Sequence, residues 1–84
     1  METEQRLKSE TEKWAAKLRK ELPSAAPAVK EGREFIVNIK AYLDDSGRFT
    51  EKGDLVRAFE AVVWAWAWLE IGREMKILKV LPDK

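Results

Sequence analysis

Residues 61–69 constrain the fold of this chain more than any other segment. The nine residues carry no charge and include three of the four tryptophans, Trp64, Trp66 and Trp68. If the segment is helical, each residue advances roughly 100° around the axis, so Trp64 and Trp68 lie about 40° apart and Trp66 points almost the opposite way. Bulky apolar side chains on opposite sides of a helix need cover on most of its circumference. We therefore expect this helix to contact other helices, a partner subunit or a ligand on several sides.

The composition is that of one small folded domain spanning residues 1–84. Apolar residues make up 45% of the chain and charged residues 37%, which argues against disorder. The 16 Lys and Arg residues nearly balance the 15 Asp and Glu residues, for a net charge of +1. A nucleic-acid-binding protein usually has a clear basic excess or stripe, so we expect no nucleic-acid partner.

The sequence contains no cysteine and no histidine. Disulfides and thiolate metal sites are therefore excluded, and the usual general base and commonest metal ligand are missing. The polar N-terminus does not resemble a signal peptide, and the longest apolar run is far shorter than the ~20 residues of a membrane span. We expect a cytoplasmic protein without a membrane segment, cofactor or metal. Its high charge and scarcity of Asn and Gln are typical of thermophile proteins.

The apolar spacing predicts three helices and no strand. The first helix is expected over residues 3–22, where Leu7, Trp14, Leu18 and Leu22 follow coiled-coil spacing. Pro23 ends it.

A second helix is expected over residues 25–52, with Ser24 as its N-cap and Pro27 in its first turn. Two parallel apolar stripes indicate contact with two other helices; they are Ala28, Gly32, Phe35, Ile39, Tyr42, Ser46 and Phe49, and Val29, Ile36 and Leu43. Gly47 is unfavourable inside a helix, and the helix could instead end near Ser46. We favour continuity because Phe49 keeps the repeat.

The third helix is expected over residues 54–76, after Gly53 in a left-handed conformation and Asp54 as N-cap. Ala58, Ala65 and Gly72 are small and seven residues apart, which favours close approach of a neighbouring helix. Only the arc of Glu60, Glu70 and Glu74 is polar, so the helix is apolar over about 280° of its circumference. The apolar tail from Ile77 to Pro82 is expected to fold back on the body.

Short connections between long helices favour antiparallel neighbours. The expected fold class is therefore all-α, an up-and-down antiparallel three-helix bundle.

Several features occur in order between residues 30 and 78. They are an aromatic-Leu-x-Asp segment at 42–45, Phe49, a Lys-Gly-Asp turn at 52–54, Ala58-Phe59, and Trp64-Ala65 followed by Trp68-Leu69-Glu70. Together they resemble the DUF357 family, small archaeal domains of unknown function. The resemblance implies a three-helix bundle and an archaeal, cytoplasmic origin, and it implies no activity. Trp66, Ala67, Glu70 and Ile71 depart from the family pattern.

Candidate catalytic and metal sites have simpler interpretations. Asp44, Asp45, Glu51 and Asp54 could suggest a divalent-cation site, but a calcium loop starting at Asp44 would place Phe49 at the required glycine. We interpret these acids as solvated residues at helix ends. Serine nucleophiles would lack a histidine base, and the three glutamates of the third helix are most simply its solvent face. We therefore expect no catalytic residue and no enzyme activity.

The aromatic side chains divide into core and surface. Helical spacing favours a core position for Trp14, Trp68, Phe35 and Phe49. Because two neighbouring helices cannot cover a helix that is apolar almost all round, some of Trp64, Trp66, Ile71 and Met75 should be exposed in a monomer.

Those four residues are our interface candidates. Our leading hypothesis is a non-enzymatic protein-interaction module, self-associating through the third helix as a homo-oligomer such as a dimer, or binding another protein. The alternative is an accessory or small apolar-ligand-binding domain that serves an enzyme partner.

Overall fold

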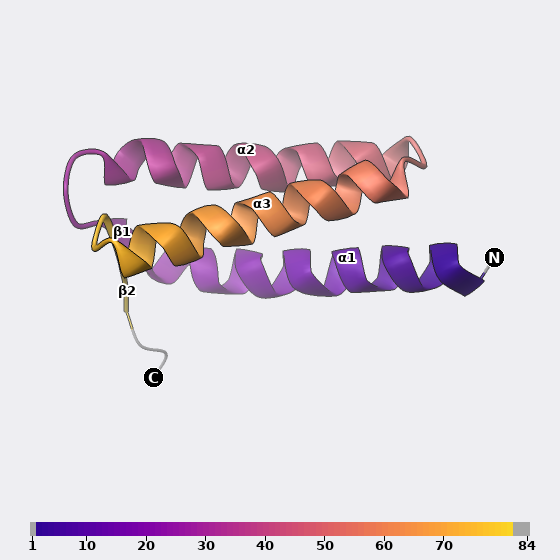
Figure 1. Ribbon diagram of the computed structural model, residues 1–84, viewed down its shortest axis with the longest axis horizontal. Helices are drawn as coiled ribbons and strands as arrows, with labels where there is room; N and C mark the ends of the chain where they lie inside the picture. Colours follow the sequence, from indigo (N-terminus) through magenta and orange to yellow (C-terminus); the bar gives the residue numbers. More distant parts are fainter. Residues whose placement is uncertain (1, 82–84) are drawn as a thin grey trace.

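The fold is an up-and-down bundle of three helices, as the apolar spacing predicts. The computed structural model describes residues 2–81 (Figure 1). In chain order the elements are α1 (Glu2–Glu21), a 3₁₀ turn η1 (Leu22–Ser24), β1 (Ala25–Pro27), α2 (Gly32–Glu51), α3 (Leu55–Glu74) and β2 (Leu78–Val80). Helices α1 and α3 run in the same direction and α2 runs opposite to them (Figure 1). Helix α3 packs against both neighbours, whereas α1 and α2 barely touch each other.

The boundaries between helices α2 and α3 follow the predicted capping. Helix α2 continues through Gly47, and Gly53 has a φ of 80°. The N–H of Gly53 donates to Thr50 O and that of Asp54 to Phe49 O, which is the Schellman arrangement that satisfies the last carbonyls of a helix. The Asp54 side chain then accepts a hydrogen bond from the N–H of Arg57. The predicted continuity of α2 and both capping roles are confirmed.

The second helix starts at Gly32, and the predicted start at residue 25 is wrong. Ser24 is not its N-cap, and Pro27 lies in a strand, not in a first helical turn. Strands β1 and β2 pair antiparallel, with Ala26 opposite Lys79, so the prediction of no strand is also wrong. The Leu81 N–H donates to Ser24 O and the Ala28 N–H to Ile77 O, at 2.9 Å each. These bonds join segments about fifty residues apart, which local periodicity does not reveal.

The β-ribbon packs onto two glycines, one at the start of α2 and one near the end of α3. A Cβ at Gly32 would lie 2.7 Å from both Ile77 O and the Pro27 Cα. A Cβ at Gly72 would lie 2.7 Å from Leu78 Cδ1 and 3.0 Å from Phe35 Cδ2. The predicted close approach at Gly72 is therefore confirmed, but the segments that approach it are both β2, through Leu78, and helix α2, through Phe35. The apolar tail does fold back as far as Leu81; Pro82 lies outside the described residues.

The core lies where α3 meets both of its neighbours. Its buried members are Ala15, Leu18, Ile39, Leu43, Val62, Ala65, Leu69 and Leu78. Ser46 is also buried, and its hydroxyl donates to Ala58 O across the α2–α3 contact at 2.8 Å. Trp14 was predicted to be core, but 39% of its surface is exposed, because its position on α1 faces the rim of the contact with α3.

The glycines provide a test of how the ribbon docks. Gly32→Ala should lower the free energy of unfolding by about 1–3 kcal/mol, because the added Cβ overpacks a contact with backbone atoms. Gly47→Ala is the matched control, since nothing lies within 4 Å of its Cβ. That change should raise the free energy of unfolding by roughly 0.5–1 kcal/mol. Urea unfolding followed by circular dichroism measures both, and equal effects would contradict the close contact at Gly32.

Candidate functional site

The alternating tryptophans of α3 pair with aromatic rings on both neighbouring helices. Trp64 stacks on Tyr42 of α2, with ring centroids 6.4 Å apart and planes at 20°. Trp66 meets Trp14 of α1 edge to face, at 5.9 Å and 89°. Aromatic pairs at such separations add about 0.5–1.5 kcal/mol beyond their buried area. The alternation in the sequence thus reflects a central helix with a neighbour on each side.

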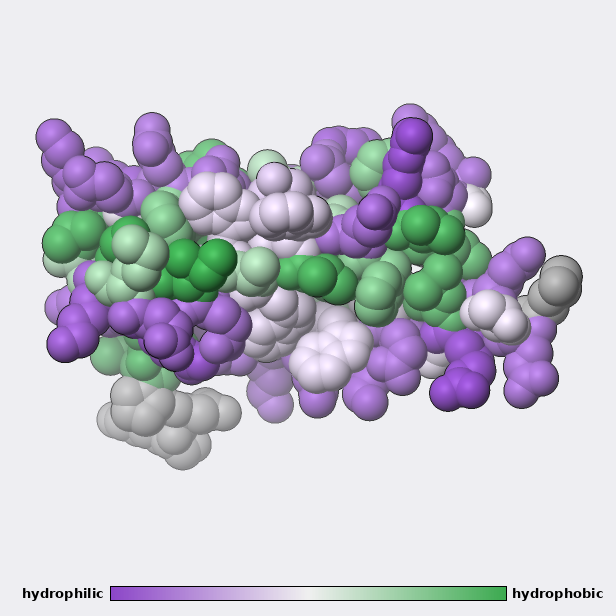
Figure 2. Space-filling view, viewed as in Figure 1, coloured by the Kyte–Doolittle hydropathy of each residue, from purple (hydrophilic) through white to green (hydrophobic). Residues whose placement is uncertain are grey.

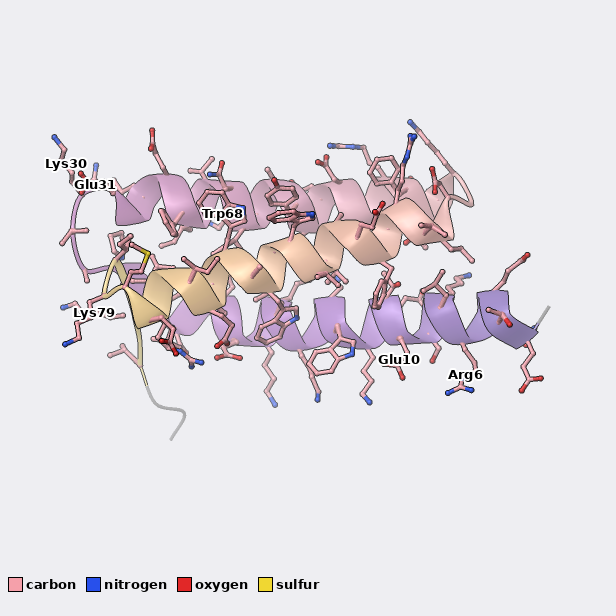
Figure 3. The ribbon with its side chains drawn as sticks, in the orientation of Figure 1. Arg6, Glu10, Lys30, Glu31, Trp68 and Lys79 are labelled. Carbon is pink, nitrogen blue, oxygen red and sulfur yellow. The ribbon has the colours of Figure 1, made fainter. Side chains whose placement is uncertain are left out.

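Trp68 is held by packing alone. Its side chain lies between α3 and α2 (Figure 3), with its ring centroid 4.7 Å from that of Phe35 and the planes at 81°. Its Nε1 is buried and has no hydrogen-bond partner among residues 2–81. An unpaired buried donor costs about 1–3 kcal/mol, so shape and apolar contact must hold this indole in place.

Trp66 is tied to α1 and does not share a surface with Trp64. Its Nε1 donates to the backbone carbonyl oxygen of Trp14 at 3.0 Å, and its side chain is half-buried. Trp14 in turn donates to Glu10 at 3.1 Å; Glu10 lies on the outer side of α1 (Figure 3). The sequence placed Trp66 among the interface candidates, and the structure places it in the α1–α3 contact.

The other three candidates lie on the outward face of α3. The exposed fractions are 55% for Trp64, 49% for Ile71 and 64% for Met75, and Val56 on the same face is 63% exposed. We call these four residues the outer stripe. Figure 2 shows hydrophobic residues in a band along α3, with hydrophilic residues above and below it. Helical spacing relates Val56 to Ile71 by about four turns, and that signal could have identified Val56 from the sequence.

Charged residues of α3 share the outward face with the outer stripe. Glu60 and Glu74 are exposed, and Glu70 accepts a hydrogen bond from Arg73 at 2.7 Å. Near the start of the helix, Arg57 lies 3.6 Å from the Asp54 carboxylate. The outward face of α3 therefore combines apolar side chains with charges of both signs.

The acidic residues around the α2–α3 turn have local roles. Asp54 caps α3, and Asp45 pairs with Arg48. No three acidic side chains within residues 2–81 come together in a cluster that could hold a metal ion. None of the helices described is both long and apolar enough to cross a membrane.

These features define a small three-helix protein closed at one end by a β-ribbon. The family model described as "Protein of unknown function (DUF357)" matches residues 7–78, so the chain belongs to the DUF357 family. The chain is similar to a protein of known crystal structure, AF1782 from Archaeoglobus fulgidus, of the same family. The two are 47% identical with a TM-score of 0.86, over 94% of this chain and 99% of that chain. Among curated proteins, no sequence matches this one.

The family match confirms the resemblance seen in residues 30–78 and extends it to most of α1. The expected fold class is confirmed as well, since the neighbour has the same fold along nearly its whole length. The family's description assigns no activity.

Trp66, in the α1–α3 contact, and the exposed Trp64 allow a matched comparison. Trp66→Phe should lower the free energy of unfolding by at least about 0.5–1.5 kcal/mol, because the bond to Trp14 O is lost. Trp64→Phe should change it by less than about 0.5 kcal/mol, since this indole is 55% exposed and its side chain makes no hydrogen bond among residues 2–81. Thermal and urea unfolding of both variants measure the difference. A larger loss for Trp64→Phe would show that the bond to α1 contributes little.

Proposed function

We propose that this protein is a non-enzymatic interaction module that pairs with a second copy of itself through the outer stripe of α3. The observation that carries the proposal is the exposure of Val56, Trp64, Ile71 and Met75 along one helix face. Contiguous exposed apolar residues on a small soluble domain usually mark a binding surface, and tryptophan is enriched at interface hot spots. A cytoplasmic setting belongs to the same proposal, supported by a chain without cysteine.

The size of the domain also supports self-association. A chain of 84 residues buries only somewhat over ~60% of its unfolded surface, so its stability is marginal unless packing is good or the protein oligomerises. Helix α3 packs its buried face against the two neighbouring helices, and its outer stripe remains exposed to water. Covering that stripe with a second copy would remove apolar surface from solvent at about 25 cal/mol per Å².

A second copy fits the stripe by symmetry and by charge. In an antiparallel pair, partners lie at equal distances from the two-fold axis. An axis near Val63 and Trp64 places Val56 opposite Ile71, so that apolar side chains meet. The same axis places Arg57 opposite Glu70, so that opposite charges meet, and Glu60 falls opposite the small Ala67. The composition supports the non-enzymatic part, because no histidine or cysteine is available as base or nucleophile.

Sedimentation equilibrium over a micromolar concentration range tests the proposal. Wild-type protein should behave as a reversible monomer–dimer system. Ile71→Glu should raise the dissociation constant at least tenfold, which corresponds to about 1.4 kcal/mol, because a charge is then buried against Val56 of the other copy.

Val37→Glu on α2 is the matched control for that variant. Val37 is 63% exposed, like Val56, and belongs to a helix of the same length, so the same change should leave the dissociation constant unaltered. A wild-type protein that stays monomeric across the range would refute self-association. Equal weakening by the two variants would show that the outer stripe is not the interface.

A further inference from the structure

The groove between α1 and α3 contains two hollows that share one wall. That wall is the edge-to-face pair of Trp14 and Trp66. The two helices run in the same direction (Figure 1), so the residues that line the hollows follow one another in the same order on both sides. The groove lies on the α1 flank of α3, away from Trp64, which packs toward α2.

The hollow toward the start of α3 is apolar. It has a volume of about 340 Å³, and beyond the two indoles it is lined by Phe59, Val62 and Val63. No charged side chain lines it. Sites for small molecules usually enclose about 300–1,000 Å³ and are mainly apolar, so this hollow has the size and chemistry for a short aliphatic chain.

The hollow toward the end of α3 is cationic and has a volume of about 610 Å³. Lys17, Lys20 and Arg73 line it, against one acid, Glu21. Arg73 already bonds Glu70. Lys17 and Lys20 form no ion pair among residues 2–81. The Lys17 Nζ lies 4.7 Å from the centroid of the Trp14 ring, which places an ammonium group at the boundary between the two hollows.

We propose that this groove binds an amphipathic organic anion, namely an aliphatic chain that ends in a carboxylate. The chain would lie on Phe59, Val62 and Val63. The carboxylate would lie beyond the indole pair, beside the ammonium groups of Lys17 and Lys20. From Phe59 to Arg73 the groove extends about 21 Å along α3, at 1.5 Å per residue. A medium-length carboxylate therefore spans from the apolar hollow to the lysines.

The charge arrangement selects an anion over other amphiphiles. The chain as a whole has a net charge of only +1. The lining of the second hollow has three cations and one acid, and because Arg73 pairs with Glu70, Lys17 and Lys20 are the cations available to an anion. Lys17 and Lys20 are solvent-exposed, so they attract an anion as surface charges do, and this attraction should weaken as salt is added. An amphiphile with a cationic head and the same chain should be repelled from the same place.

The test is calorimetric titration with decanoate, and with decyltrimethylammonium as the ligand of reversed charge, both below their micelle concentrations. Decanoate should bind with one site per chain, and the cationic amphiphile at least tenfold more weakly. The double variant Lys17→Glu, Lys20→Glu should bind decanoate at least tenfold more weakly than wild type. The double variant Lys8→Glu, Lys13→Glu makes the same change of net charge on α1 away from the hollows and should bind decanoate like wild type.

Equal affinity for the two amphiphiles would overturn the proposal, and so would an equal loss of decanoate affinity in the two double variants. The absence of any decanoate binding would overturn it as well. Val63→Asp tests the apolar half. Because Val63 also lies near the proposed two-fold axis, the change is made in Ile71→Glu protein, and the variant should fold because Val63 is 49% exposed. That variant should also bind decanoate more weakly. Unchanged affinity would exclude the apolar hollow as part of the binding site. Decanoate should bind Ile71→Glu protein, in which self-association is weakened, with the same affinity as wild type. The proposed ligand site and the proposed self-association can therefore fail separately.

Discussion

The structure depends on the close approach of α3 to its two neighbours. The buried face of α3 is built largely from small side chains: Ala58, Ala61, Ala65 and Gly72. Because these residues project little, the backbones come near enough for Ser46 to bond Ala58 O across the contact. The same proximity brings the larger rings at the edges of the helix within reach of Tyr42, Phe35 and Trp14. Larger residues on this face would separate the helices and leave those indoles without partners.

A central helix also explains why two distinct surfaces exist. Helix α3 is covered on two sides, so its outward face, with Trp64, Ile71 and Met75, remains in water. On the α1 side α3 is covered incompletely, since Trp14 and Trp66 meet edge to face and hollows remain on both sides of the pair. One surface is an exposed apolar stripe, which suits another protein surface. The other is a groove with an apolar and a cationic half, which suits a smaller molecule.

The β-ribbon explains how the loop after α1 and the end of the chain become part of the core. Leu78 is buried against Gly72, and Ile77 and Pro27 lie against Gly32. The ribbon therefore depends on two positions without a Cβ, on different helices. The family match ends at Leu78, so the matched region includes this contact as well as α2, α3 and most of α1. The similar fold of AF1782 over 99% of its length agrees with an arrangement maintained by such contacts.

The sequence by itself determined the helices, their caps and their order. Expected helices at 3–22 and 54–76 agree with Glu2–Glu21 and Leu55–Glu74, and Gly53 and Asp54 act as expected. Periodicity and capping involve residues within a few positions of each other, so they can be identified in the linear chain. The sequence also indicated that α3 needs cover on several sides and that two neighbouring helices cannot provide all of it. The exposure of Trp64, Ile71 and Met75 agrees with this prediction.

Only the tertiary structure decided the start of α2 at Gly32, the pairing of β1 with β2, and the attachment of Trp66 to Trp14. Each of these depends on groups about fifty residues apart, which meet only after the helices have packed.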